Sequence, residues 1–368
     1  MNESLRYKDF GDDYSKKDPF KKYAMQVALR TADNLKDLGF PEVTASRGES
    51  AYVIDIGPFY LASVIEGLGT KNLIADAMYE LDPSKSYYDA VAIDTVASIV
   101  NDLITVGARP LTVLPHWSIG DNSWLGDKVR SYELVNGWAE ACDEAMAIYA
   151  GGETPTNKGI IYPHTAELSG SAFGIIQPKD RLTLGDKLES GDHIVLIESS
   201  GIHANGVSLA RDIVERLPDT YLTELPSGRK IGEVLLNRSY IYARLQDALF
   251  QEGVDIHYIV NVTGHGWSKL MRANKDFTYR IHTLPKVPEE YLFLQEEGPI
   301  SNEESYGVFN MGAGLVLYVP ECDVEKTRKS SSDMGFRNWD AGVVEQGPKQ
   351  VILEPLGFGY GKETLDLR

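Results

Sequence analysis

Cysteine is scarce in this chain of 368 residues, which contains only Cys142 and Cys322. The two lie far apart and form no Cys-x-x-Cys pair, which argues against a cysteine zinc site and a disulfide framework. Two reduced cysteines are typical of a cytoplasmic protein. A secretory signal is also missing, because residues 1–20 are rich in charge and contain no apolar core. We therefore expect a cytoplasmic location.

Runs of basic residues and long apolar runs are missing as well. Lys and Arg number 36 against 54 Asp and Glu, a net charge of −18. Nucleic-acid binding normally needs a basic patch that displaces counterions from phosphates, and an anionic membrane surface attracts the same kind of patch. The most apolar stretch, 90–114, contains Asp94, Asn101, Asp102 and Arg109, so it is not a membrane span. The sequence predicts neither a nucleic-acid nor a membrane partner.

The rest of the composition is that of a folded protein. Hydrophobic residues make up 43% and charged residues 24%, which excludes a disordered chain. The length favours two domains, or three. A polar break at Gln177–Asp180 is the most suitable boundary. We place an N-terminal domain at 1–177, a C-terminal domain at 178–347 and a tail at 348–368.

Hydrophobic periodicity predicts helices and strands that alternate irregularly along both halves. Asp18-Pro19 has the pattern of a helix start, with Asp as the N-cap and Pro as the first helical residue. The later helices are predicted at 89–106, 129–149, 207–217, 240–251, 301–308 and 323–334. Strands are predicted at 51–56, 59–65, 111–117, 168–176, 193–198, 257–261, 277–282, 313–319, 341–345 and 350–354. Gly357–Lys362 lacks the Ser or Thr that a phosphate loop needs next, so we expect a flexible tail.

Glu66–Lys71 follows an apolar strand and contains two glycines. Glycines let backbone N–H groups approach an anion, and Lys71 would add a positive charge. The alternative is a tight turn with an exposed lysine. Asn101-Asp102 lies in an apolar helical run, where burial is costly unless the pair is bonded or bound to a cation. The alternative there is a pair on the solvent face.

Three further clusters carry polar groups next to glycines. Glu153, in Gly151–Thr154, is a carboxylate of the kind that Mg²⁺ prefers, or a surface residue after a helix end. His203, in Ser199–Gly206, has the chemistry of a phosphate donor or an acid–base group, while Asn205 has that of a helix cap. Thr263–Gly266 precedes a predicted helix, where backbone donors meet anions. Phe309–Gly314 looks structural.

Taken in order, these clusters resemble the aminoimidazole ribonucleotide synthetase family. The resemblance covers about 5–347 and departs from the family pattern at four places. Glu66 and Glu167 stand where the family has Asp, and His265 interrupts a run of glycines. Thr112–His116 replaces a Phe-Phe-Leu-Asp-Tyr segment. The matching segments are 7–13, 67–71, 100–103, 107–111, 151–154, 199–206, 263–266 and 309–314.

The resemblance implies an α+β fold with two domains. The N-terminal domain would contribute strands to a barrel that spans a homodimer, and the C-terminal domain would pack a sheet with helices. The implied enzyme is a ligase of de novo purine biosynthesis. It uses ATP to phosphorylate the formyl oxygen of formylglycinamidine ribonucleotide, after which the amidine nitrogen closes the imidazole ring and phosphate leaves. ATP and Mg²⁺ are the implied cofactors, and a requirement for K⁺ stays open.

The resemblance also implies roles for particular residues, with His203 on a flexible loop. The implied catalytic residues are His203, Asp102 and Lys71. ATP would be bound by Lys8, Asp9, Gly11, Gly67, Gly69, Thr70, Lys71 and Asn101. The nucleotide substrate would be bound by Ser200, His203, Asn205, Thr263 and Gly264. Mg²⁺ would be held by Asp102, Glu66 and Glu153.

Two alternative functions stay open. One is a related ATP-dependent enzyme such as a small-molecule kinase, for example a thiamine-monophosphate kinase. A selenophosphate synthetase is disfavoured, because it needs a reactive Cys or selenocysteine near its N-terminus and the first cysteine here is Cys142. The other alternative is an inert nucleotide-binding paralogue, motivated by the departures at Glu66, Glu167 and His265.

Overall fold

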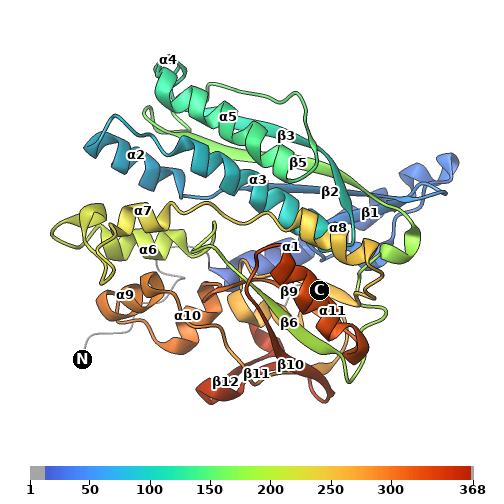
Figure 1. The fold of residues 1–368 in the computed structure, drawn as a ribbon. Helices are drawn as coiled ribbons and strands as arrows, with labels where there is room; N and C mark the ends of the chain where they lie inside the picture. The colour runs from blue at the N-terminus through green and yellow to red at the C-terminus, as the bar shows by residue number, and fades with distance from the viewer. Residues whose placement is uncertain (1–12, 366–368) are drawn as a thin grey trace.

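The computed structural model describes residues 13–365, and within them two β-sheets are each packed by helices (Figure 1). The first sheet and its helices come from the N-terminal half. That half contains α1 (Tyr14–Ala28), η2 (Leu29–Leu38), η3 (Thr44–Ser46), β1 (Tyr52–Asp55), β2 (Tyr60–Gly67), α2 (Asn72–Leu81), α3 (Tyr88–Ile104), β3 (Arg109–Ile119), α4 (Ser123–Gly126), α5 (Lys128–Glu144), β4 (Ile148–Tyr149) and β5 (Ala166–Ile176), where η marks a 3₁₀ helix.

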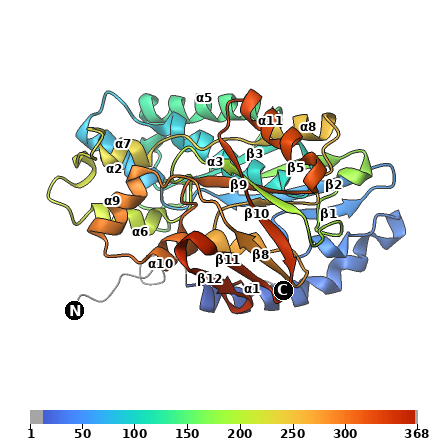
Figure 2. The same cartoon turned by 60° about the horizontal axis from the view of Figure 1, so that its bottom comes forward.

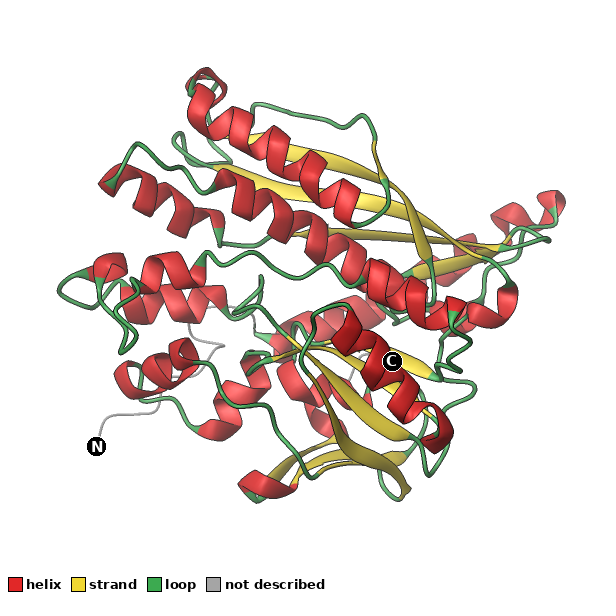
Figure 3. Cartoon of the chain, in the orientation of Figure 1, coloured by secondary structure: helices red, strands yellow, loops and turns green. Residues whose placement is uncertain are grey.

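The first sheet has the strand order β1-β2-β5-β3-β4, antiparallel except for the β3–β4 pair. Helices α3 and α5 cover one of its faces (Figure 3). Every residue of α3 is buried except Asp89 and Ser98. A helix that is apolar on all sides belongs between other layers, and α3 accordingly lies between the sheet and the C-terminal half.

The other face of the first sheet exposes apolar side chains. Ile65 is 75% exposed, Ile148 67% and Phe173 41%. Thr112 pairs with both Phe173 and Ile148, so the three residues share one face of the sheet. Ile65 pairs with the residue two positions before Phe173 and therefore points the same way. Contiguous exposed apolar patches of this kind are characteristic of interaction surfaces.

The second sheet belongs to the C-terminal half and has the order β12-β11-β8-β10-β6-β9-β7, with β8 and β11 parallel. Helix α11 packs on β6 and β10, while η6 packs on β8 and β11. The elements are η4 (Lys179–Arg181), β6 (His193–Glu198), α6 (Val207–Val214), η5 (Thr220–Leu222), α7 (Ile231–Leu235), α8 (Ala243–Gln251), β7 (Tyr258–Asn261), η6 (Gly266–Met271), β8 (Phe277–Ile281), α9 (Glu289–Glu297), α10 (Asn302–Val308), β9 (Ala313–Val319), η7 (Glu321–Asp323), α11 (Val324–Asp333), β10 (Asn338–Gln346), β11 (Gln350–Leu353), η8 (Glu354–Leu356), β12 (Phe358–Gly361) and η9 (Lys362–Thr364).

A segment between α7 and α8 joins the two halves to each other. The side chain of Asn101, on α3, donates to the carbonyl of Tyr240 at 2.8 Å and accepts the backbone N–H of Tyr242 at 3.0 Å. Both polar ends of a buried amide are therefore satisfied. None of the helices within 13–365 is both long and apolar enough to cross a bilayer.

Two predicted helix boundaries were wrong. The first helix begins at Tyr14, because Asp13 rather than Asp18 caps it by accepting the N–H of Ser15 at 3.1 Å. Helix α5 ends at Glu144, and Ile148–Tyr149 leaves it to pair with β3.

The predicted flexible tail is instead part of the second sheet. Phe358–Gly361 pairs with Gln350–Leu353. Tyr360 is 6% exposed, and its hydroxyl donates to the carbonyl of Glu303 at 2.7 Å. Pairing with β11 and the burial of Tyr360 together hold this short strand in place.

Candidate active site

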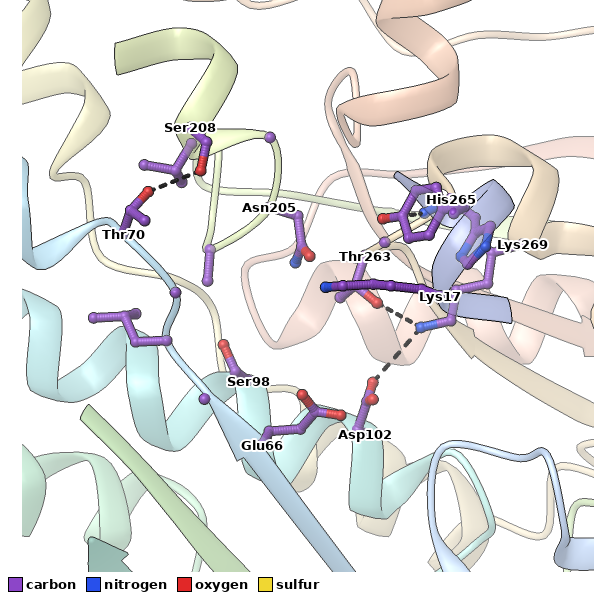
Figure 4. A pocket seen from close by; sticks show the side chains of 18 of the residues that line it. Lys17, Glu66, Thr70, Ser98, Asp102, Asn205, Ser208, Thr263, His265 and Lys269 are labelled. Carbon is purple, nitrogen blue, oxygen red and sulfur yellow. Dashed lines mark hydrogen bonds and ion pairs between the residues drawn. The ribbon is translucent and has the colours of Figure 1, made fainter. Parts of the chain in front are cut away.

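A cavity of about 560 Å³ lies between the two halves (Figure 4). Its walls come from the end of β2, from α3, from α1 and from two loops of the C-terminal half. Four cationic side chains and three carboxylates line it. The lining residues are Tyr14, Lys17, Lys21, Glu66, Gly67, Leu68, Gly69, Thr70, Ser98, Asp102, Glu167, Ala204, Asn205, Gly206, Val207, Ser208, Thr263, Gly264, His265, Lys269 and Arg272.

One wall is built from backbone-rich turns. Gly69 has a φ of +77°, which glycine adopts without strain. The hydroxyls of Thr70 and Ser208 lie 3.1 Å apart and connect this loop to the start of α6. Helix α6 begins after Gly206, whose φ is +75°. Unpaired N–H groups at a helix start favour an anion, so this wall suits a phosphate.

The floor of the cavity carries two carboxylates and a lysine. Asp102 Oδ1 accepts Asn261 Nδ2 at 2.8 Å and lies 3.9 Å from Lys269 Nζ. Burial and, second, the charge of Asp102 raise the pKa of Glu66 to about 7, although Lys269 acts in the opposite direction. Burial also lowers the pKa of Lys269 to about 8, while Asp102 favours its charged form. Lys269 donates in addition to the hydroxyl of Thr263.

The remaining cations lie around the opening. Lys17 and Lys21 come from α1, and Arg272 follows η6. The Arg272 guanidinium donates to the carbonyl of Gly48 at 2.8 and 3.1 Å and to the hydroxyl of Ser50 at 2.8 Å. These hydrogen bonds fix its position. In a chain with a net charge of −18, this concentration of cations marks the cavity as a place for an anion.

The structure brings many of the predicted site residues to this cavity. They come from four segments that are far apart in the sequence. These residues are Glu66, Gly67, Gly69, Thr70, Asp102, Asn205, Thr263 and Gly264. Lys8, Asp9 and Gly11, predicted to bind ATP, lie outside the described residues.

Lys71 is not at the cavity surface. Its side chain is fully buried, and Nζ lies 2.6 Å from Asp94 Oδ2 and donates to the carbonyl of Asn237 at 3.0 Å. Asp94 accepts the backbone N–H of Ser239 at 2.8 Å. Because the ammonium is already paired with a carboxylate, Lys71 joins α3 to the segment before α8 instead of contacting a phosphate.

His203 does not line the cavity either. The ring is 5% exposed, and its Nε2 accepts the backbone N–H of Ser200 at 3.2 Å. Burial and, to a lesser extent, the charge of Lys71 lower the pKa of His203 to about 3. The imidazole is therefore neutral near pH 7. The expected flexible catalytic loop is instead a tightly packed turn, with His203 at a φ of +56°.

Three other predicted residues are also placed elsewhere. Asn101 is occupied by the backbone contacts described above. The hydroxyl of Ser200 donates to the carbonyl of Arg238. Glu153 is exposed beside β3, where its carbonyl accepts the N–H of Trp117 at 2.9 Å. Within the described residues, no three His, Cys, Asp or Glu side chains form a metal-binding group. Glu153 therefore does not complete a three-carboxylate metal site with Glu66 and Asp102.

Sequence reasoning missed the cations of the cavity. Lys17 and Lys21 are four residues apart, which shows that they share a face of a helix but not what that face meets. The contact that places this face of the helix at the cavity joins Asp18 to His265, 247 positions later in the chain. Lys269 follows Thr263 closely enough to have been suspected, because both flank a glycine-rich helix start.

Two family models match the chain. The model for the AIR synthase related protein N-terminal domain matches residues 48–176, and that for its C-terminal domain matches residues 189–354. The chain belongs to the AIR synthase related family. Relatives in this family include a phosphoribosylformylglycinamidine cyclo-ligase from Methanobrevibacter smithii, 33% identical over 315 residues, with 83% of this chain and 86% of the relative covered. Another is the same-named protein from Carboxydothermus hydrogenoformans, 31% identical over 360 residues, with 95% and 99% covered.

Solved structures share the fold at lower identity. A chain of the HypE–HypF complex aligns with a TM-score of 0.60 and 17% identity, covering 85% of this chain and 92% of the other. PurL from T. maritima complexed with FGAR aligns with a TM-score of 0.58 and 15% identity, covering 92% of this chain and 51% of PurL. These likenesses establish the two-sheet α+β architecture.

Proposed function

We propose that this chain is a phosphoribosylformylglycinamidine cyclo-ligase of de novo purine biosynthesis. The observation that carries the proposal is the similarity to curated cyclo-ligases along almost the whole length, 95% of this chain and 99% of the relative in one case. The cavity also contains the glycine turns, cations and carboxylates that a phosphoryl-transfer reaction needs.

The reaction has two steps. The formyl oxygen of the substrate attacks the γ-phosphorus of ATP, and the bond to the β-phosphate oxygen breaks to release ADP. The amidine nitrogen then attacks the activated carbon, loses a proton and expels phosphate, which leaves aminoimidazole ribonucleotide. Gly67–Thr70 and the start of α6 bind ATP phosphates, and Lys269 stabilises the charge that develops during transfer.

Glu66 and Asp102 fit a magnesium site of the kind that works with ATP. Mg²⁺ is usually held by one or two carboxylates together with phosphate oxygens and waters, and two acidic side chains next to a phosphate-binding wall meet that requirement. Burial and, second, the charge of Asp102 raise the pKa of Glu66, and a bound cation would favour its charged form. When bound, Mg²⁺ neutralises charge on the transferred phosphoryl group.

The assembly we propose is a cytoplasmic homodimer in which the first sheets of two copies form a barrel. The support is the exposed face that carries Ile65, Ile148 and Phe173. Closed two-fold dimers are the commonest assemblies. We assign ATP binding and dimerisation to residues 1–177, and extend the C-terminal domain from 178 through β12.

The test is an assay of the purified chain with formylglycinamidine ribonucleotide, ATP and Mg²⁺. We expect aminoimidazole ribonucleotide to form, detected by mass spectrometry, and none when ATP is left out. ATP turnover only with another acceptor, such as thiamine monophosphate, would establish a related kinase. ATP binding without any turnover would establish an inert paralogue. Each of these two results contradicts the proposal.

A further inference from the structure

His265 has a backbone conformation that favours glycine. Its φ is +68°, in the left-handed region that costs a residue with a Cβ roughly 1 kcal/mol or more. A strained non-glycine residue at the edge of a binding cavity needs contacts that keep it there.

The ring and the backbone N–H of His265 contact helix α1. The ring stacks on Tyr14 with centroids 3.7 Å apart and an angle of 22° between the planes. Nε2 donates to Asp18 Oδ2 at 3.2 Å, and the backbone N–H donates to the hydroxyl of Tyr14 at 3.2 Å. The adjacent Gly264 lets the ring of Tyr14 approach, because a Cβ there would lie 2.8 Å from its hydroxyl.

Helix α1 is largely exposed. In the part of the chain that the structure describes, Asp18 is the only buried residue of α1. Phe20 is 71% exposed and Tyr23 65%. Figure 2 shows α1 on the opposite side of the molecule from α5, away from the helical layer over the first sheet. An isolated helix of this length is only marginally stable in water, so its position depends on contacts with the rest of the chain, and its buried residue Asp18 makes one of these with His265.

The docked face of α1 is also the face that reaches the cavity. Tyr14, Lys17, Asp18 and Lys21 follow the spacing i, i+3, i+4 and i+7 of one helical face. Tyr14 and Asp18 contact His265, while Lys17 and Lys21 line the cavity. Figure 4 shows the Lys17 side chain extending into it.

We propose that His265 is a positioning residue that docks α1 at the mouth of the cavity and thereby presents Lys17 and Lys21 to the phosphates of a bound nucleotide. The docking follows from the contacts within the chain. The identity of the ligand rests on the proposed function. A purely local role, in which His265 only fills space, predicts no effect on α1 or on the ligand.

Two variants separate docking from folding. His265→Gly removes the ring but suits the positive φ, so the loop itself is not strained. Asp18→Ala removes the acceptor and raises the intrinsic helix propensity of α1, so any loosening is not due to a weaker helix. Tyr23→Ala is the matched control, because it makes the same change of propensity on the exposed side of α1.

The first measurement is hydrogen exchange of the backbone amides in 14–28, without ligand. We expect exchange at least tenfold faster in His265→Gly and Asp18→Ala than in the wild type, and unchanged in Tyr23→Ala. Undocking lets the helix unfold locally, which exchange detects. Equal exchange rates in the wild type, His265→Gly and Asp18→Ala would overturn the proposal, whatever the chain catalyses.

The second measurement is the Kd for ATP with Mg²⁺, by calorimetry, which needs no turnover. We expect His265→Gly to raise the Kd at least fivefold, and Lys17→Met to add little in that background because the lysine has already moved away. Independent, additive losses would overturn the positioning role. If the wild type binds no ATP, the proposed function fails, while the exchange measurement still decides whether His265 docks α1.

Discussion

At the scale of single residues, neighbours decide which polar groups are available for chemistry. Asp102 and Lys71 were both predicted to be catalytic residues. Asp102 faces the cavity with Lys269 at 3.9 Å, whereas Lys71 is enclosed with Asp94 at 2.6 Å. A buried charge must be paired, and the partner of Lys71 is supplied by the protein itself. A lysine therefore lines the cavity at position 269 and forms a buried ion pair at position 71.

Asp102→Asn tests the cavity carboxylate. The amide keeps an acceptor for Asn261 but loses the negative charge beside Lys269. We expect kcat for ATP turnover to fall at least ~10²-fold, since charge stabilisation of this kind is typically worth that much. The melting temperature should change little, and thermal unfolding checks it. A variant with wild-type turnover would remove Asp102 from the site.

His203 tests the difference between the sequence expectation and the structure. The sequence pattern predicted that His203→Ala would lower kcat by ~10²-fold and leave stability unchanged. The buried, neutral ring predicts the reverse: a clear loss of melting temperature, with kcat changed far less. A large fall in kcat at unchanged stability would restore the catalytic role.

His203 also predicts a pH dependence of stability. Its folded pKa of about 3 lies below the unfolded value of 6.5, so the unfolded state takes up a proton first. The contribution of the neutral His203 to the free energy of unfolding is fully present above pH 6.5. It is lost as the pH falls toward 3, by up to about 1.4 kcal/mol per pH unit. Urea unfolding of the wild type and His203→Gln between pH 7 and 5 measures the difference. Parallel pH profiles would show that His203 is not buried neutral.

At the scale of elements, a polar cluster fixes the segment before α8 against α3. Lys71, Asp94 and Ser239 belong to it. Lys71→Met leaves Asp94 buried and uncompensated, which costs about 3–5 kcal/mol. We expect that loss in chemical denaturation, and recovery of most of it in the double variant Lys71→Met/Asp94→Leu. Equal stability of single variant and wild type would show that the pair contributes nothing.

Elements with strong periodicity could be predicted from sequence. The strand at 193–198 matches β6, and the strands predicted at 51–56 and 59–65 overlap β1 and β2. Boundaries failed where a distant contact decided them. Asp18 looked like a helix cap because its partner, His265, lies 247 positions later in the chain. Phe358–Gly361 looked flexible because its glycines conceal the burial of Tyr360.

The candidate site could be predicted in part for the same reason. Glycine turns and carboxylates such as Gly69 and Asp102 carry local signals, since each lies at the end of a regular element. Orientation has no local signal. Whether His203 faces a cavity or the interior depends on residues such as Tyr242 and Gly314 that pack around its ring. Roles that depend on which way a side chain points therefore could not be assigned from sequence.

At the scale of the whole molecule, the exposed face of the first sheet leads to a prediction about assembly. Ile65→Asp/Phe173→Asp places two charges on that face. In a homodimer these charges would be buried without partners, which is strongly unfavourable. We expect light scattering to give a mass of one chain for this variant and two for the wild type. Leu292→Asp, on the exposed side of α9, is the control and should stay dimeric. A monomeric wild type would contradict the proposed barrel.

The central claim is that the cavity between the two halves activates a formyl oxygen with ATP. The measurement that tests it most directly follows that oxygen. The purified chain is incubated with ATP, Mg²⁺ and formylglycinamidine ribonucleotide labelled with ¹⁸O at the formyl group. The account predicts aminoimidazole ribonucleotide, ADP and phosphate in equal amounts, with one ¹⁸O atom in each phosphate released. Unlabelled phosphate, or no aminoimidazole ribonucleotide, would contradict it.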